Sequence, residues 1–311
     1  MSKIQENYCG ICGNSSLRQL FSKSSASGEK QYLICRCVAC GTVQTLPRPS
    51  LQELEKCYGE NYFQKRTERG YDNYYSDALK RQIQRVYRLN LKDIGFFSYE
   101  QKLFEQSQKS GDLAPLSLDV GCAAGYFVEY LKERGWRARG IEISKHAASY
   151  GLEKLKLDIL VDDFLATGKL KKNSFDLITF WASLEHMSDP GAVLRRSWEL
   201  LKPGGQMFLS TCRYGILARA NGKNWRYMNV PEHLFFFSLK GLKKFSSECG
   251  FRTVKSISYG SGLTARKGGS FLYNVSKRFA DPFVKFLNQG DMMALNLQKG
   301  YEEKNPHTLS R

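Results

Sequence analysis

Short apolar runs alternate with amphipathic stretches along the middle of the chain, from about residue 116 to residue 260. In the stretches between the runs, apolar positions recur every three to four residues, which is typical of a helix with one buried face. Strands that alternate with helices in this way predict an α/β fold built on a parallel sheet. The expected strands, in order, are LSLDV, RARGIE, LDILV, FDLITFW, QMFLST and RTVKSISY, and a seventh, antiparallel edge strand is expected at MMALNLQK.

Polar residues precede the expected helices at the positions where N-caps lie. Ser144 precedes KHAASYGL, Ser238 precedes LKGLKKFSSECGF, and Asp189 is followed by Pro190 at the first helical position. A side-chain oxygen at an N-cap accepts an N–H group that the first turn leaves unpaired, and proline is tolerated there because its missing N–H is not needed. The sequence therefore marks where these helices begin.

A glycine turn follows the first of these strands, within LSLDVGCAAG at residues 116–125. Gly121 and Gly125 let a ligand lie against bare backbone, and the helix that follows offers unpaired N–H groups at its N-terminus. Glu142 ends the next apolar run, where an acid is placed to bind both hydroxyls of a ribose. Dinucleotides and S-adenosylmethionine both use this geometry. A dinucleotide site usually has the pattern GxGxxG, whereas the turn here is Gly-Cys-Ala-Ala-Gly.

The turn resembles motif I of the class I S-adenosylmethionine-dependent methyltransferases, D/E-x-G-x-G-x-G, with Ala123 at the middle glycine. The blocks FDLITFW, EHMSDP and LLKPGG resemble the same family in order and spacing, over about residues 113–260. The resemblance implies a seven-stranded Rossmann-like methyltransferase sheet with helices on both faces. It also implies contacts to the methionine end, the ribose and the adenine of the cofactor. The cofactor-binding residues so expected are Asp119, Gly121, Cys122, Gly125, Glu142, Asp163 and Phe164.

Four cysteines near the N-terminus form two C-x2-C pairs with 24 residues between them. Four thiolates from two such turns can close a tetrahedral zinc site. Disulfides are not expected, because no signal peptide is evident and the nine cysteines of the chain are an odd number. With four protein ligands and no open position, the zinc ion is expected to be structural. The expected ligands are Cys9, Cys12, Cys37 and Cys40.

The expected organisation has four parts. A zinc ribbon, a helical linker or cap region, a class I methyltransferase domain and a tail are expected at residues 1–46, 47–112, 113–300 and 301–311, respectively. The cysteine pairs and the following LPRPSLQELEKCYGENYF resemble the opening of bacterial methyltransferases that carry an N-terminal zinc-binding module. Such enzymes occur among modifiers of deoxysugars, surface polysaccharides and secondary metabolites. Their larger C-methyltransferase members carry a further C-terminal domain that this chain is too short to hold.

The net charge of +17 over 311 residues bears on which kinds of molecule the protein binds. Positive charge of this size steers anions, so an anionic small molecule or sugar precursor is expected as the substrate. Nucleic acid is not expected, because the chain has neither an arginine-rich block nor an RNA-binding module. The basic amphipathic segment 268–288 can either lie on a membrane surface or pack on the sheet. No apolar run approaches the roughly 18 residues of a membrane span, and a reducing cytoplasm is the expected location.

Two of the four histidines follow strands on the loop side of the expected sheet. His186 follows the fourth strand and His233 the fifth, and ligands of open α/β sheets bind beyond the carboxyl ends of the strands. Methyl transfer to a hydroxyl or a carbon acid needs a base, so both are candidate bases, with His233 favoured.

Glu185, His186 and His233 also match part of a divalent-metal motif, E-x-x-E-H with a later histidine, whose first position here is Ala182. Substrate contacts are expected from Trp225, Arg226 and Tyr227.

These observations favour an S-adenosylmethionine-dependent methyltransferase that acts on a small molecule or a sugar or glycan precursor. Transfer to oxygen is favoured and transfer to carbon comes second. One alternative is an RNA-binding or RNA-modifying protein that uses the zinc ribbon and the basic surface. Another is a catalytically silent scaffold that keeps the fold. The tyrosines at 71, 74 and 75 are expected either to cover the cofactor or to form an interdomain packing patch.

Overall fold

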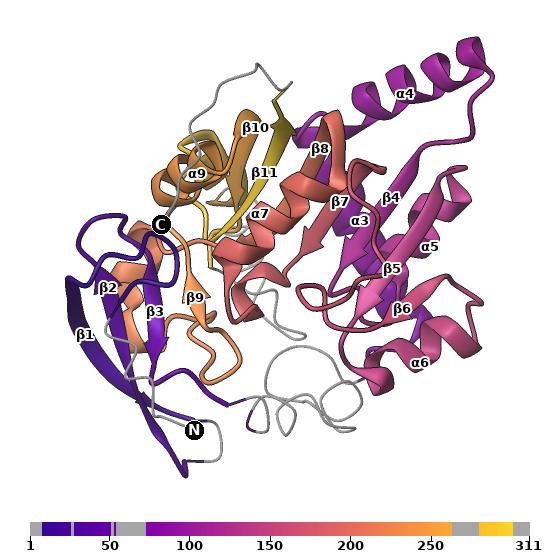
Figure 1. The fold of residues 1–311 in the computed structure, drawn as a ribbon. Helices are drawn as coiled ribbons and strands as arrows, with labels where there is room; N and C mark the ends of the chain where they lie inside the picture. Colours follow the sequence, from indigo (N-terminus) through magenta and orange to yellow (C-terminus); the bar gives the residue numbers. More distant parts are fainter. Residues whose placement is uncertain (1–7, 26–27, 51–52, 54–72, 263–279, 301–311) are drawn as a thin grey trace.

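Two β-sheets organise the computed structural model, which describes residues 8–25, 28–50, 53, 73–262 and 280–300 (Figure 1). The larger sheet has seven strands in the order β10-β11-β8-β7-β4-β5-β6, and the smaller has four in the order β1-β2-β3-β9. The strands of the larger sheet are β4 (Leu116–Val120), β5 (Arg137–Glu142), β6 (Ile159–Val161), β7 (Phe175–Trp181), β8 (Leu201–Cys212), β10 (Phe251–Tyr259) and β11 (Met292–Lys299).

Five neighbouring strands of the larger sheet, β4 to β8, run parallel, as the alternating pattern predicts. The antiparallel direction predicted for the last strand is also confirmed, because β11 runs antiparallel to both of its neighbours. Its predicted edge position is wrong: β11 lies between β8 and β10, and β10 forms the edge. Most side chains of β11 are buried, as expected for a strand with helices over both faces of its sheet.

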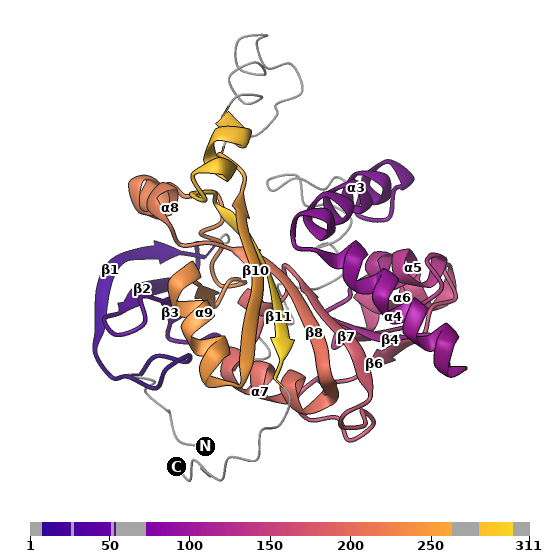
Figure 2. The same ribbon diagram turned by 90° about the horizontal axis from the view of Figure 1, so that it is seen from above.

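The helices cover both faces of this sheet, as predicted (Figure 2). On one face, α3, α4 and α5 enclose a core cluster that includes Leu91, Phe127 and Phe208, and on the other α7 and α9 pack over Ile178 and Leu209. The seven α-helices are α3 (Asp77–Asp93), α4 (Phe96–Ser110), α5 (Tyr126–Glu133), α6 (Lys145–Glu153), α7 (Pro190–Leu200), α8 (Ile216–Asn221) and α9 (Leu239–Glu248), with short 3₁₀ turns η1 (Leu184–His186) and η2 (Gly222–Asn224), all within the ranges given above.

The three predicted N-caps are confirmed. The side chains of Ser144, Asp189 and Ser238 accept backbone N–H groups at the starts of α6, α7 and α9. Each cap satisfies a donor that has no partner within its helix, which stabilises the helix start by about 1 kcal/mol. Over the described ranges, no helix combines the length and the apolar character that crossing a bilayer requires.

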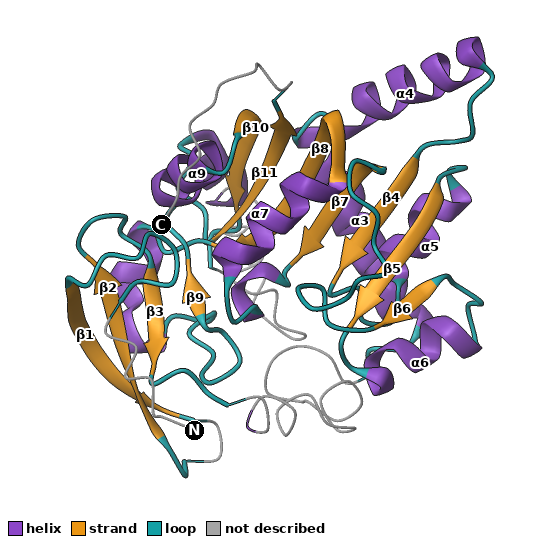
Figure 3. Cartoon of the chain, in the orientation of Figure 1, coloured by secondary structure: helices purple, strands orange, loops and turns teal. Residues whose placement is uncertain are grey.

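The smaller sheet joins the N-terminal segment to the rest of the molecule. Its strands β1 (Leu17–Ser24), β2 (Gln31–Cys37) and β3 (Val43–Leu46) come from the N-terminal segment, whereas β9 (Phe235–Phe236) follows β8 of the larger sheet. Figure 3 shows β9 beside β3. Cys9, Ile11 and Cys37 also belong to the same core cluster as Leu184 and Phe235, so the two parts share a hydrophobic core.

Some predicted features lie outside the described residues. These are Tyr71, the tail expected at 301–311 and most of the basic segment 268–288. In the described end of that segment, the side chains of Phe283 and Phe286 are exposed.

Candidate active site

The predicted site residues follow parallel strands whose carboxyl ends meet at one edge of the larger sheet. The glycine turn follows β4, Glu142 ends β5, and Asp163 lies just after β6. His186 and His233 lie in the segments after β7 and β8. The chain order reverses at β4, which has β5 on one side and β7 on the other. Such a reversal is where open α/β sheets form their ligand crevice.

The glycine turn is held by conformation and by close packing. Gly121 and Gly125 have φ of 70° and 76°, in the left-handed region that favours glycine. A β-carbon on Gly121 would lie 2.7 Å from the Cβ of Ser183, and one on Gly125 would lie 2.7 Å from the Cδ1 of Leu157. The Gly121 N–H donates to the Ile141 carbonyl over 2.9 Å, which ties the turn to β5.

Two acids lie beside this turn. The carboxylate of Glu142 accepts the N–H of Ala123 over 3.0 Å and that of Ser144 over 2.9 Å, so it links the turn to the start of α6. Burial raises the pKa of Glu142. Asp119 accepts a hydrogen bond from the Thr179 hydroxyl over 2.6 Å, yet burial, with a further contribution from the Glu142 charge, raises its pKa to about 7. Once ionised, these two acids favour a positive charge beside the turn.

The residues predicted at the adenine and at the turn differ in exposure. Asp163 is exposed, and its Oδ1 accepts the N–H of Leu165 over 2.7 Å. Phe164 is only 5% exposed and packs edge-to-face on Phe180. Cys122 is also buried, with its sulfur directed at the backbone of β5. The cofactor contacts expected of Phe164 and Cys122 therefore depend on their backbone or on a small exposed part, and they stay predictions.

A tyrosine cluster covers the start of α5. Tyr126 directly follows the glycine turn, and its hydroxyl donates to the carbonyl of Tyr74 over 2.8 Å. The Tyr74 ring stacks on Tyr126 at 5.3 Å between centroids, and the Tyr75 ring stacks on Tyr150 of α6 at 4.9 Å. The segment before α3 thus packs against both helices that begin at this edge of the sheet, α5 and α6.

The structure brings the two candidate bases into contact. The rings of His186 and His233 meet edge-to-face, with 4.7 Å between their centroids. The Nδ1 of His186 lies 2.7 Å from the Glu232 carbonyl oxygen. Because a carbonyl only accepts, Nδ1 carries a hydrogen, and Nε2 is the basic nitrogen of the neutral ring. His233 is buried, and its Nδ1 lies 3.9 Å from the Cys212 sulfur.

Glu185 lies next to this histidine pair. Ligand atoms of Glu185, His186 and His233 all lie within 4.8 Å of one another, which makes this a group that could hold a divalent cation. Burial raises the pKa of Glu185, and the nearby His186 opposes that shift. The carboxylate accepts a hydrogen bond from the Thr211 hydroxyl over 2.9 Å, so it already has one protein partner.

The predicted substrate contacts are split between core and surface. Trp225 is 2% exposed, and its indole N–H donates to the Asp291 carboxylate over 2.9 Å. Tyr227 packs edge-to-face on Trp225, and burial raises its pKa above the usual range. Arg226 is exposed, with its guanidinium 5.0 Å from the centre of the Tyr227 ring. Of the three, Arg226 has the side chain most open to a ligand.

The four N-terminal cysteines form one cluster. The sulfurs of Cys9 and Cys40 lie 3.6 Å apart, as do those of Cys12 and Cys37, and all four lie within 4.8 Å of one another. Zinc bonded to four thiolates at about 2.3 Å holds its sulfurs about 3.8 Å apart, whereas a disulfide needs about 2.05 Å. The spacing fits a metal site, and Cys35 lies outside the cluster.

Comparison with known proteins identifies the family. A family model described as "Methyltransferase domain" matches residues 101–256, which is half of the chain. The chain belongs to this methyltransferase family. The matched range contains every predicted cofactor-binding and catalytic residue, and it excludes the four clustered cysteines.

Curated relatives of this methyltransferase-family chain match a shorter stretch. It is 34% identical to the ubiquinone biosynthesis O-methyltransferase of Pseudomonas paraeruginosa over 109 residues, which cover 33% of this chain and 47% of the relative. It is 37% identical over 99 residues to the protein of the same name from Xanthomonas oryzae pv. oryzae, covering 30% and 41%. The chain thus spans less than half the length of these relatives. Their names give no support to the expected role in polysaccharide biosynthesis.

Solved structures are similar at lower identity. A SAM-dependent methyltransferase from Archaeoglobus fulgidus is 17% identical, with a TM-score of 0.45 over 66% of this chain and 99% of that chain. A possible histamine N-methyltransferase from Thermotoga maritima is 19% identical, with a TM-score of 0.45 over 71% and 97%.

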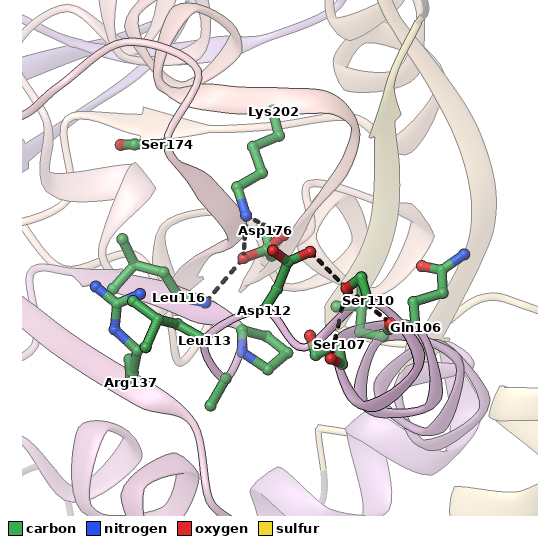
Figure 4. A pocket seen from close by; sticks show the side chains of 13 residues that line it. Gln106, Ser107, Ser110, Asp112, Leu113, Leu116, Arg137, Ser174, Asp176 and Lys202 are labelled. Carbon is green, nitrogen blue, oxygen red and sulfur yellow. Dashed lines mark hydrogen bonds and ion pairs between the residues drawn. The ribbon is translucent and has the colours of Figure 1, made fainter.

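The methyltransferase domain also has a pocket of about 570 Å³ at the opposite edge of its sheet (Figure 4). Leu116 and Arg137, the first residues of β4 and β5, line this pocket. The Lys202 ammonium bonds both oxygens of Asp176, at 2.8 and 2.9 Å, and Asp176 also accepts the N–H of Leu116. These contacts hold the strand starts together, and the pocket contains none of the predicted site residues.

Several polar residues of this methyltransferase, near Glu185, were not predicted. The hydroxyl of Tyr259 lies 2.6 Å from the Ser210 hydroxyl and accepts from the Asn90 amide over 3.0 Å. Burial raises the pKa of Tyr259 to about 12. Asn90 lies on α3, far from any motif. The sequence feature that could have pointed to it is a polar residue between Leu89 and Leu91 in an amphipathic helix.

Proposed function

We propose that this chain is an S-adenosylmethionine-dependent methyltransferase that transfers a methyl group to an oxygen of a small molecule. The observation that carries the proposal is the pair of acids, Asp119 and Glu142, beside the glycine turn. S-adenosylmethionine carries a sulfonium and an ammonium group, whereas a dinucleotide carries a negatively charged pyrophosphate. An ionised Asp119, two residues before the first glycine, favours the first ligand and opposes the second, whereas the acid at Glu142 suits the ribose of either ligand.

The residues at this edge fit the cofactor. Each oxygen of Glu142 accepts one backbone N–H and has a second lone pair for a ribose hydroxyl. The backbone of Gly121 and Gly125 would hold the methionine end, and Asp163 would meet the adenine. His146 lies in the first turn of α6, and its Nε2 is buried with no hydrogen-bond partner among the described residues, which leaves a polar group for a ligand. When bound, the cofactor supplies an electrophilic methyl group.

The histidine pair would remove the proton of the acceptor. As the acceptor oxygen takes the methyl group, its proton passes to an imidazole nitrogen, and we favour His233 as the base. His186, fixed through Nδ1 by the Glu232 carbonyl, would orient the acceptor or its partner ring. Alignment of the two reactants at this edge would supply several kcal/mol of barrier lowering, which is the scale reported for well-oriented groups.

Two observations favour oxygen as the acceptor atom. The curated relatives are named O-methyltransferases of ubiquinone biosynthesis, which supports a small-molecule acceptor in place of a polysaccharide precursor. The histidine pair also offers imidazole nitrogens that can take the proton of a hydroxyl group.

We propose a structural zinc ion at the four cysteines. Their spacing fits four thiolates around one metal, and four protein ligands leave no open position for catalysis. The chemistry is therefore assigned to the edge of the larger sheet, outside the cysteine cluster.

Calorimetry with S-adenosylmethionine tests the proposal. Replacing Glu142→Gln keeps the shape but removes the charge, so we expect affinity to fall by about 1–3 kcal/mol, the scale of charged hydrogen bonds. The control is Glu153→Gln, an exposed acid on α6 that should leave affinity unchanged. A folded wild-type protein that gives no binding heat would favour a silent scaffold. Binding to mixed RNA that weakens steeply with salt would favour the RNA-binding alternative.

A further inference from the structure

Residues 8–46, which carry the four clustered cysteines and strands β1 to β3, are called the cysteine module here. This module contacts the methyltransferase domain at the segment that carries His233. Strand β3, which follows the second cysteine pair, runs antiparallel to β9, with Val43 opposite Phe236 and Gln44 opposite Phe235. His233 lies two residues before β9. The last strand of the smaller sheet, β9, is therefore part of the segment that carries His233, the favoured base.

Thr45 donates two hydrogen bonds to backbone carbonyls of this segment. Its hydroxyl donates to the His233 carbonyl over 2.9 Å, and its N–H donates to the Leu234 carbonyl over 3.0 Å. Thr45, His233 and Leu234 are all buried, so water does not replace these donors. An unpaired buried carbonyl is costly, which makes this pair of bonds a strong local constraint.

The N–H groups of the same two residues bond within the methyltransferase domain. The His233 N–H donates to the Asn229 carbonyl, and the Leu234 N–H donates to the Glu185 carbonyl, each over 2.8 Å. The backbone of His233 is thus held from two sides. One side is its own loop and the η1 turn that carries His186, and the other side is Thr45.

The cysteine turns are in turn fixed against β3 and β9. The Gln44 side chain accepts the N–H of Gly10 over 3.0 Å and donates to the Tyr8 carbonyl over 2.9 Å, on either side of Cys9. A β-carbon on Gly10 would lie 2.7 Å from the Phe235 ring, so the first turn lies directly on β9. The first cysteine turn is therefore held against both β3 and β9.

The second cysteine turn has its own contact with the methyltransferase domain. The Ser238 hydroxyl, which caps α9, also donates to the Cys40 carbonyl over 3.3 Å. A β-carbon on Gly241 would lie 2.4 Å from the same carbonyl oxygen, so α9 approaches the turn closely. The segment of residues 233–238 is therefore anchored to Thr45 of β3 at its start and to the second cysteine turn at its end.

We propose that the four-cysteine module positions His233, and that Thr45 is the positioning residue through which it acts. The module holds the backbone of the base from a second side, and its own rigidity depends on the four-cysteine cluster. The catalytic consequence rests on the proposed function of His233, whereas the mechanical link rests on the contacts above.

Hydrogen exchange of the full-length, zinc-loaded protein tests the link. Thr45→Val keeps the branched shape but removes the hydroxyl, so the His233 carbonyl loses its donor. We expect amides in residues 229–237 to exchange about tenfold faster, the scale of one lost buried hydrogen bond. Exchange in the glycine turn, residues 116–126, should not change. Thr45→Ser, which keeps the donor, should restore slow exchange in residues 229–237.

Imidazole NMR gives a second measurement, because the chain has only four histidines. With ring-labelled histidine, Thr45→Val should move the signals of His233 and His186 and leave those of His146 and His307 in place. Thr253→Val, a matched change in β10, should move none of the four. Unchanged His233 signals and unchanged exchange in Thr45→Val would overturn the proposal.

Removal of one cysteine ligand tests the role of the cluster. In Cys40→Ser we expect faster exchange both in residues 8–46 and in residues 229–237. Faster exchange confined to residues 8–46 would contradict the coupling. If Cys40→Ser fails to fold, the Thr45 variants still decide the matter, with zinc content measured to show that the metal is retained.

The two proposals fail in different ways. Absence of S-adenosylmethionine binding to the wild-type protein would overturn the proposed function and leave the exchange results intact. Normal cofactor binding with no response of residues 229–237 to Thr45→Val would overturn the positioning role alone.

Discussion

The two halves of the candidate site are built in different ways. The cofactor half comes from one continuous stretch, in which the glycine turn, Glu142 and Asp163 follow three successive strands. The histidine half is assembled from distant parts of the chain, since Thr45, Glu185 and Thr211 all contact the residues around His233 or His186. The functional residues of the first half are close in sequence, although Thr179 and Ser183 contact them, whereas those of the second half come from remote segments.

This difference predicts that the histidine half can be damaged without harm to cofactor binding. His233→Ala should lower the rate of methyl transfer by roughly 10²–10⁴, the contribution of a positioned base. The affinity for S-adenosylmethionine should stay the same, because the turn and its acids are untouched. The measurement is transfer of labelled methyl to a hydroxylated acceptor, with calorimetry in parallel. Turnover close to that of the wild type would return His233 to a structural role.

The cofactor half should instead be sensitive to a single methyl group. Gly121→Ala adds a β-carbon at positive φ and places it 2.7 Å from Ser183, so both strain and overlap oppose it. We expect a loss of about 2–4 kcal/mol in the free energy of unfolding, from left-handed strain and overpacking together.

The control is Gly95→Ala, which also has positive φ but has no atom within 4 Å of the added carbon. Strain alone should cost about 1–2 kcal/mol there. Chemical denaturation of both variants gives the comparison. Equal losses would show that the turn is not closely packed against Ser183.

A further expected effect concerns the charge of Asp119, and it depends on pH. Its pKa is raised to about 7 in the folded protein, so between pH 4 and pH 7 the folded state binds a proton that the unfolded state has lost. Stability from this group therefore falls as pH rises towards 7, by about 1 kcal/mol per pH unit, and levels off above it.

Asp119→Asn removes this dependence and keeps an acceptor for Thr179. The variant should gain stability relative to the wild type as pH rises from 5 to 7, and the gain should stop growing above pH 7. Thermal unfolding across this pH range measures it. A difference that is constant with pH would mean that Asp119 is ionised throughout.

The same contrast explains what the sequence could predict. The strands, the caps at Ser144 and Ser238 and the glycine turn depend on neighbouring residues, so they could be inferred from local pattern. The clustering of the four cysteines followed from their spacing. The histidines were placed on the correct edge because each follows a parallel strand.

Features that depend on remote partners could not be inferred. The position of β11 in the strand order depends on its pairing with β8 and β10. The apolar pattern of a strand does not show which strands are its neighbours. Trp225 is a residue type that often contacts substrates. Here, however, its indole is buried and donates a hydrogen bond to Asp291, 66 residues later. Thr45 belongs to no motif, and its importance appears only in its contact with His233, 188 residues away.

Paired calorimetric titrations of the wild-type protein with S-adenosylmethionine and with NAD at pH 8 test the central claim most directly. The two ligands share an adenosine, whose ribose Glu142 would bind in either case, but they differ in the charge that they bring to Asp119. We predict saturable binding of S-adenosylmethionine and no measurable binding of NAD. Equal or tighter binding of NAD would contradict the assignment of the glycine turn.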